Sequence, residues 1–151
     1  MSDLYDTDFV LWAKSQAELL RLRAAGKLAN EAEVDWSNIA EEIESLGKSD
    51  QRELRNRVRT ILTHLIKLQA SPAAEPRAGW RATILEQRAE LRVVLDDSPS
   101  LKPTLASVIS RELPAARDLA LAALVVHREQ PSTDPAGLSY TEDEVMGPWL
   151  P

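Results

Sequence analysis

Four polar residues fall on faces of predicted helices that are otherwise apolar, and they are the residues of this chain best placed to do chemistry: His64, Gln87, Arg88 and Glu112. The two helices of an antiparallel hairpin rise equally per residue, so positions can be mirrored about the loop between them. Mirroring His64 about the loop at 71–79 leads to Gln87 and its neighbour. Mirroring those about the next turn leads to Glu112. The sequence therefore predicts one polar layer across the middle of a helical bundle.

Two interpretations of this polar layer stay open. In the first, His64 or Arg88 bonds to Glu112, and the layer is a satisfied hydrogen-bond network that fixes the register of the helices. In the second, His64 and Glu112 are ligands of a small metal or ligand site in the bundle core. The first is favoured because most buried polar groups have hydrogen-bond partners. No cofactor is therefore predicted.

The motifs that would identify a reaction are missing from the sequence. There is no cysteine, which excludes disulfides, thiolate metal sites and Cys nucleophiles. There is no Glu-x-x-His pair of a carboxylate di-iron bundle, no His-Glu-x-x-His motif of a zinc protease, no Gly-rich phosphate loop and no Gly-x-Ser-x-Gly elbow. His64 and His127 are the only histidines, so a three-histidine site is impossible. Nothing in these residues argues for an enzyme.

The helix that would carry His64 is predicted over residues 35–69, with Asp35 as its N-cap. At about 100° per residue, one set of apolar residues stays within roughly 80° of Trp36 on a helical wheel. The set is Ile39, Ala40, Ile43, Leu46, Leu54, Val58, Ile61, Leu65 and Leu68. A stripe this persistent specifies one long helix that other helices must cover.

Two residues interrupt this stripe, Gly47 and Asp50. The apolar phase continues beyond Gly47, so we expect a continuous helix, although a glycine in a helix interior also allows a break. A missing side chain on the packed side lets a bulky ring come close. Counting back through the connector at 27–34 brings Trp12 to this level, so we expect Trp12 to pack over Gly47. Asp50 is expected to need a polar partner such as an arginine.

Three further helices and a tail complete the prediction. The helices span residues 7–25, 80–96 and 99–128, and residues 130–151 form a mostly irregular tail. Trp80 is expected to face inward, and Pro114 to kink or interrupt the last helix. The apolar face of that helix is expected to consist of Leu101, Leu105, Val108, Leu119, Ala123 and Val126.

Together these elements predict an all-α protein with a single domain over residues 1–151. Its fold is expected to be an antiparallel four-helix bundle with one long central helix and an irregular C-terminal tail. No run of residues alternates apolar and polar side chains as a half-buried strand would. The length of 151 residues suffices for a real core without disulfide or metal support.

Several motifs, taken together, resemble a known family. They are Tyr5-Asp6-x-Asp8-Phe9-x-x-Trp12, Gln16-Ala17-x-Leu19-Leu20, Asp35-Trp36-x-x-Ile39-Ala40-Glu41-Glu42-Ile43-Glu44-x-Leu46-Gly47, His64-Leu65-Ile66-Lys67 and Trp80-Arg81-x-Thr83-Ile84 followed by Gln87-Arg88. This combination covers most of the chain and is similar to the bacterial domain-of-unknown-function family 29. The chain departs from the family's pattern at Leu68, where a tryptophan would be expected. The resemblance implies an all-helical fold and no established activity.

Charge is unevenly distributed along the chain, whose net charge is −6. Acidic residues dominate both ends, and a basic segment lies between them, over residues 48–92. Its basic residues include Arg52, Arg55, Arg59, Lys67, Arg77, Arg81 and Arg92. The favoured interpretation is that acidic and basic helices complement one another, and the alternative is a patch for an anionic partner. An acidic chain with no aromatic residues among its basic ones argues against nucleic acid.

The function best supported by the sequence is that of a small cytoplasmic helical scaffold or adaptor, which acts through protein–protein contacts or self-association. Four tryptophans and a long apolar stripe, with only four helices to cover them, leave surplus apolar surface. The alternative is a bundle that binds a metal or small ligand at the layer around His64. The acidic start of the chain has no leader pattern, and no apolar stretch approaches the roughly 20 residues of a membrane span. We therefore expect a cytoplasmic protein without a membrane anchor.

Overall fold

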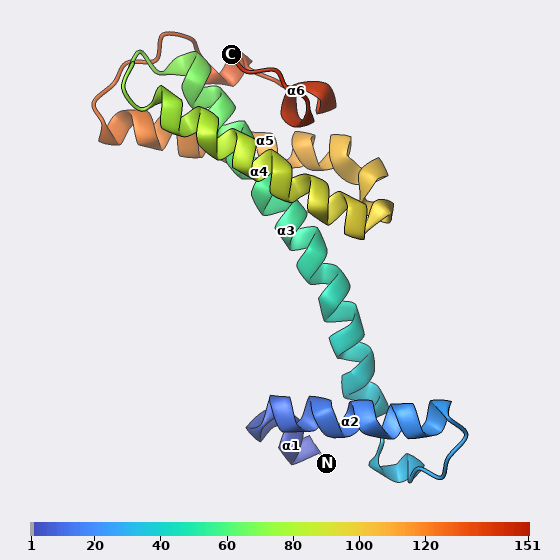
Figure 1. The fold of residues 1–151 in the computed structure, drawn as a ribbon. Coiled ribbons are helices and arrows are strands. Elements are labelled where there is room, and N and C mark those ends of the chain that lie inside the picture. Colours follow the sequence, from blue (N-terminus) through green and yellow to red (C-terminus); the bar gives the residue numbers. More distant parts are fainter. Residues whose placement is uncertain (1) are drawn as a thin grey trace. The chain divides into compact units, whose positions relative to one another are not determined.

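The computed structural model describes residues 2–151, and in this part of the chain the regular secondary structure is all helical, with no β-strand (Figure 1). The α-helices are α1 (Ser2–Thr7), α2 (Phe9–Ala24), α3 (Trp36–Ala70), α4 (Arg77–Asp97), α5 (Leu105–Val126) and α6 (Glu142–Met146). Short 3₁₀ turns lie at Glu31–Glu33, Pro99–Thr104 and Pro135–Gly137. The predicted all-α class is confirmed, and Met1, the first residue of the predicted domain, lies outside the described residues.

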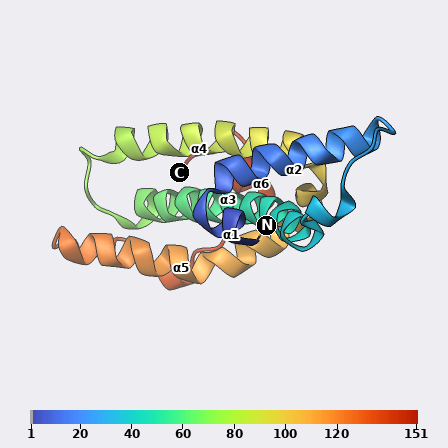
Figure 2. The ribbon, with the colours of Figure 1, turned by 90° about the horizontal axis from the view of Figure 1, so that it is seen from below.

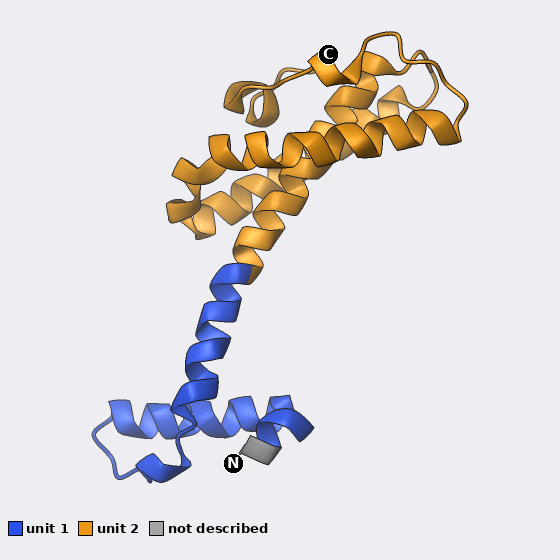
Figure 3. Ribbon diagram, turned by 180° about the vertical axis from the view of Figure 1, so that it is seen from behind, with its two compact units in different colours: residues 1–48 blue, residues 49–151 orange. Residues whose placement is uncertain are grey.

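The chain divides into two compact units, residues 1–48 and residues 49–151 (Figure 3). Helices α1 and α2 belong to the first unit, α4, α5 and α6 belong to the second, and the boundary falls inside α3. The predicted antiparallel four-helix bundle is not confirmed, because the first of its helices lies in a different compact unit from α4 and α5. Over residues 2–151, no helix combines the length and the apolar character that crossing a bilayer requires.

The first unit is organised around Trp12, which is buried. The Tyr5 ring packs edge-on against Trp12 with 4.8 Å between the ring centroids. The indole Nε1 of Trp12 donates a hydrogen bond to Asp35 Oδ2 at 3.2 Å. The Gln16 side chain, one turn further along α2, accepts from the backbone N of Asp35 at 2.8 Å and donates to the Glu33 carbonyl at 3.1 Å. These bonds join α2 to the segment that leads into α3.

In the second unit, the C-terminal half of α3 lies alongside α4 and α5 (Figure 2). The five α3 residues predicted for this part of the core, Leu54, Val58, Ile61, Leu65 and Leu68, are all buried. Helix α4 contributes Ile84, Leu91, Val94 and Leu95, and α5 contributes Leu105, Ile109 and Leu124. The C-terminal tail adds Tyr140 and Val145 to the same core, so it completes the packing of this unit.

Three predicted helix boundaries differ from the structure. The first predicted helix, 7–25, begins only at Phe9, because the Asp8 side chain caps α2, and the separate short helix α1 precedes it. Helix α4 begins directly after Pro76, earlier than predicted, because proline is tolerated at the start of a helix. The last predicted helix opens with the 3₁₀ turn Pro99–Thr104, in which Pro103 has no N–H group for an α-helical bond.

Helix α5 is not interrupted at Pro114, and its buried face differs in part from the predicted one. Leu119 and Val126, which the sequence assigns to the core, are exposed. The buried face instead includes Ala116 and Ala120. The buried face runs from Leu105 and Ile109 through these two alanines to Leu124, so small side chains are packed in the middle of α5 only, where they allow a neighbouring helix to approach closely.

Helix α3 is continuous through Gly47, as predicted, and begins after Asp35, which accepts a hydrogen bond from the backbone N of Asn38 at 3.4 Å. The prediction that Trp12 packs over Gly47 is wrong. A Cβ atom placed on Gly47 would meet no heavy atom within 4 Å outside its own helix backbone. Trp12 lies at the start of α3 instead, because its indole N–H bonds to Asp35.

Replacement of Gly47 by alanine is expected to raise the free energy of unfolding by about 0.5–1 kcal/mol, because alanine restricts the unfolded chain and the space for its Cβ atom is open. Urea denaturation followed by far-UV circular dichroism measures this change. Gly147→Ala is the matched contrast and should destabilise, because its Cβ atom would collide with the Asp143 carbonyl oxygen. Equal losses of stability in the two variants would show that α3 is not an open, unstrained helix at Gly47.

Candidate functional site

The four residues of the predicted polar layer bond to four different sets of partners. His64 Nδ1 lies 2.9 Å from the Thr60 carbonyl oxygen. Glu112 Oε2 accepts from Arg59 Nε at 2.8 Å. Among residues 2–151, no hydrogen bond or ion pair joins two of the four. The prediction that His64 or Arg88 bonds to Glu112 is therefore wrong, because Arg59 reaches this carboxylate from α3.

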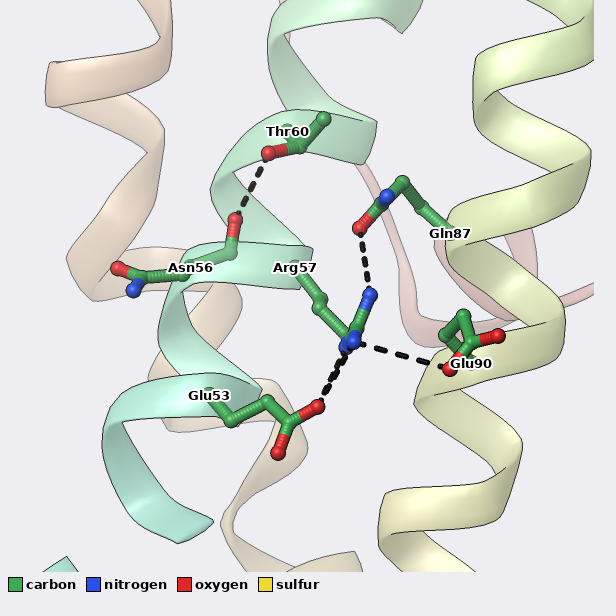
Figure 4. Close-up of polar contacts among 6 residues, drawn as sticks. All are labelled: Glu53, Asn56, Arg57, Thr60, Gln87 and Glu90. Atoms are coloured by element: carbon green, nitrogen blue, oxygen red, sulfur yellow. Dashed lines mark hydrogen bonds and ion pairs between the residues drawn. The ribbon is translucent and has the colours of Figure 1, made fainter. Parts of the chain in front are cut away.

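Gln87 belongs to a polar cluster between α3 and α4 that is centred on Arg57 (Figure 4). The Arg57 guanidinium donates to Gln87 Oε1 at 3.2 Å and pairs with Glu53 Oε1 at 2.8 Å and with Glu90 Oε2 at 3.7 Å. The three charged side chains are partly exposed, so water screens their attraction and each pair adds little stability. The cluster aligns two helices, and its central arginine was not singled out by the sequence pattern.

Arg88 is the most deeply placed of the four residues, with 1% of its surface exposed. Its Nε donates to the Val145 carbonyl and its Nη2 to the carbonyls of Glu144 and Trp149, each at 2.7 Å. Its Nη1 is buried without a partner. Burial lowers the pKa of Arg88, and nearby Arg92 lowers it further. A buried guanidinium held by carbonyl dipoles alone anchors the C-terminal tail to α4.

Several residues of the predicted basic segment also bond within the chain. Arg59 pairs with Glu112, and Arg92 donates to the Met146 carbonyl at 2.9 Å. Arg77 donates to the carbonyls of Leu68, at 2.6 Å, and Ser71, at 3.4 Å. These contacts favour the interpretation in which the basic segment serves internal packing.

The other predicted site residues lie apart from one another. Asp50 accepts from Ser98 Oγ at 3.0 Å, so its partner is a hydroxyl group and not an arginine. Trp80 packs against the edge of the core, where Lys67 Nζ lies 5.7 Å from the centroid of its ring, within reach of a cation–π interaction. In the part of the chain that the structure describes, no three His, Asp or Glu side chains are placed to hold a metal ion together. The geometry therefore gives no support to a metal centre at His64 and Glu112.

The N-terminal part of α3 carries an apolar face that is largely exposed. Trp36, Ile39, Ile43 and Leu46, which we call the α3 stripe, lie within roughly 80° of one another around the helix axis. Their spacing of three, four and three residues is that of the a and d positions of a coiled coil. Ile39 is half-buried, whereas Trp36, Ile43 and Leu46 are 54%, 64% and 69% exposed.

The hydrogen bonds of the first unit reach α3 beside the stripe. Asp35 accepts from Trp12, and Glu42 accepts from the Tyr5 hydroxyl at 2.6 Å. These two carboxylates are seven residues apart and so lie on the same side of α3. The hydrogen bond to Glu42 raises the pKa of Tyr5 to about 12, so the phenol stays protonated as a donor. The polar side of α3 is thus joined to α1 and α2, while Trp36, Ile43 and Leu46 of the α3 stripe stay exposed.

Replacement of Arg88 by lysine is expected to lower the free energy of unfolding by about 3 kcal/mol, because one ammonium group cannot replace a fork that bonds three carbonyls. Arg92→Lys, which alters one exposed contact to the same tail, should cost about 0.5 kcal/mol. Urea denaturation measures both, and limited proteolysis should show faster cleavage of residues 132–149 in Arg88→Lys only. Equal effects of the two substitutions would contradict the anchoring role of Arg88.

His64 is expected to make stability depend on pH. Burial lowers the pKa of His64 from its ordinary 6.5, Lys67 also lowers it, and the Thr60 carbonyl acts in the opposite direction. The contribution of the neutral ring is therefore complete above about pH 6.5 and is lost as pH falls through the lowered pKa. His64→Gln should flatten the decline in unfolding free energy between about pH 7 and 5. His127→Gln, at an exposed histidine, should keep the wild-type slope, and a wild-type slope in His64→Gln would refute this assignment.

The comparisons with known proteins agree with the resemblance seen in the motifs. The sequence model of a family described as a domain of unknown function, DUF29, matches residues 4–149. That match extends over both compact units. No curated protein and no solved structure matches the chain. The resemblance predicted from the sequence motifs is thereby confirmed, and this chain belongs to the family of the domain of unknown function DUF29.

Proposed function

We propose that this protein is a helical adaptor that acts through protein–protein contacts of its first unit, residues 1–48. The observation that carries the proposal is the exposure of the α3 stripe, which presents Trp36, Ile43 and Leu46 to solvent along one line of the helix. Burying a side chain of this size contributes roughly 1.5–3 kcal/mol relative to leaving it exposed. A partner that covers the α3 stripe would gain up to that contribution from each exposed side chain of the stripe.

The composition of this surface suits recognition. Tryptophan is enriched among the residues that dominate the binding energy of protein interfaces, and Trp36 lies at one end of the α3 stripe. The a and d spacing of the four residues fits the groove between side chains of a partner helix. Large apolar side chains aligned in this way also differ from isolated exposed apolar residues, which are common on monomers.

In this proposal the second unit supports helix α3. Several of its arginines bond to side chains or to the backbone of the same unit, as Arg57, Arg59 and Arg88 do. Its core unites α3, α4, α5 and the tail. Because α3 runs from the first unit into this core without a break, the second unit holds the helix that carries the α3 stripe.

The double substitution Ile43→Gln with Leu46→Gln is expected to abolish binding of a protein partner, because it removes the two most exposed apolar side chains of the α3 stripe. Glutamine is a good helix former, so α3 should persist. The measurement is capture of proteins from the source cell on the tagged full chain, quantified by mass spectrometry for wild type and variants.

The matched control is Leu119→Gln with Val125→Gln, two apolar residues on α5 that are also more than half exposed. The control should capture the same stoichiometric proteins as the wild type, and far-UV circular dichroism should show that all three proteins are folded. A set of captured proteins that the α3 double substitution leaves unchanged would refute the proposed function.

A further inference from the structure

We infer that the partner of the α3 stripe is a basic amphipathic helix, whose apolar face covers the stripe and whose lysines or arginines face the glutamates beside it. This inference rests on the function proposed above and names the chemistry of its partner. The recognition mode is a helix laid along an apolar helix face, with anchors at a and d spacing.

The charge of the exposed segment points to this partner. Residues 36–47 contain three glutamates, Glu41, Glu42 and Glu44, and neither lysine nor arginine. At about 100° per residue, Glu42 and Glu44 lie on opposite sides of the α3 stripe. With Trp36 and Ile43 at a, Glu42 falls at the flanking g position, whereas Glu44 falls at b, farther round the helix. A helix that docks on the stripe therefore meets one flanking carboxylate directly and a second one farther out on the other side. Opposite charges at such flanking positions select coiled-coil partners, and like charges reject them.

The state of these carboxylates supports a role outside their own unit. Glu42 accepts from the uncharged Tyr5 hydroxyl, so its charge is not neutralised by that bond. Of residues 2–151, no lysine or arginine forms an ion pair with Glu41, Glu42 or Glu44. The charge beside the α3 stripe is thus available to a cationic partner.

The same charge pattern argues against a second copy of this segment as the occupant. Two copies of residues 36–47 would bring Glu42 and Glu44 of each copy to one small interface without a lysine or arginine from either segment. In an antiparallel pair the two Glu42 side chains at g would face and repel each other, and in a parallel pair Glu42 would face Gly47 and gain no attraction. A partner of opposite charge removes this repulsion and adds attraction that salt should screen.

Room for the partner's backbone exists on one edge of the α3 stripe. Ala40 and Gly47 are seven residues apart and lie between the stripe and Glu44 on the helix wheel. Both are exposed, and the space around the Cβ position of Gly47 is open. Small residues at these positions let a second helix approach closely.

The test uses the full chain and two synthetic helical peptides of about two heptads, which share leucines at the a and d positions. One peptide carries lysine at the flanking e and g positions, and the other carries glutamate there. The lysine peptide should bind with a Kd in the micromolar range and shift the fluorescence of Trp36 to shorter wavelength. Trp36→Phe should remove that shift, and the glutamate peptide should bind at least tenfold more weakly.

Variants of the full chain make the test specific. Ile43→Gln with Leu46→Gln should abolish binding of the lysine peptide. Glu42→Gln with Glu44→Gln should raise the Kd about tenfold and reduce its dependence on salt. The matched control is Glu86→Gln with Glu142→Gln, which removes the same charge from exposed positions elsewhere and should leave the Kd unchanged.

Other results would contradict the basic-helix inference, the proposed adaptor function, or both. Equal binding of both peptides, or equal effects of the two pairs of Glu→Gln substitutions, would overturn the basic-helix inference. A captured cellular partner that depends on Ile43 and Leu46 but not on Glu42 and Glu44 would also overturn it, while the proposed adaptor function would stand. Sedimentation that shows a dimer dependent on Ile43 and Leu46 would replace the basic helix by a second copy. Loss of all dependence on Ile43 and Leu46 would refute both proposals.

Discussion

The length of α3 is the constraint on which the rest of the structure depends. Its 35 residues rise about 52 Å, whereas the 21 residues of α4 and the 22 of α5 rise about 32 and 33 Å. The buried residues of α3 begin only at Leu54. The α3 stripe belongs to the same apolar face but lies before that point. One sequence pattern thus produces both the core of the second unit and the exposed surface of the first.

The parts of the fold that could be predicted from the sequence are those set by local pattern. The wheel of α3 assigns Leu54, Val58 and Ile61 to the core, and they are buried. It also assigns Ile43 and Leu46 to a covered face, and they are exposed. Periodicity shows that a face of a helix is apolar, but it does not show whether another segment of the same chain packs against that face. Ala116 and Ala120 on the buried face of α5 were missed for a related reason, because close approach of helices can favour small residues over more hydrophobic ones.

The candidate polar layer could be predicted less well than the helices that carry it. Mirroring about loops gives the level of a residue along a bundle but not the residue to which it bonds. Long arginine side chains can bond to residues at other levels of the bundle, so Arg57 donates to Gln87 and Arg59 donates to Glu112. The partners of Arg88 are backbone carbonyls of the tail, and these have no signature in a sequence of side chains. For the α3 stripe the sequence is more informative. It identifies the residues and their spacing, and only their exposure to solvent could not be predicted.

Arg88 binds the C-terminal tail through backbone carbonyl groups and not through side chains. Every residue type offers a carbonyl, so the acceptors at Glu144, Val145 and Trp149 would survive a change of any of those side chains. The contact instead depends on how many residues separate the last turn of α6 from Trp149, and on how each peptide plane is turned. Insertion or deletion of one residue over 146–148 would withdraw an acceptor from a buried charge. The segment from α6 to Trp149 is therefore constrained in its number of residues, as well as in its composition at Gly147.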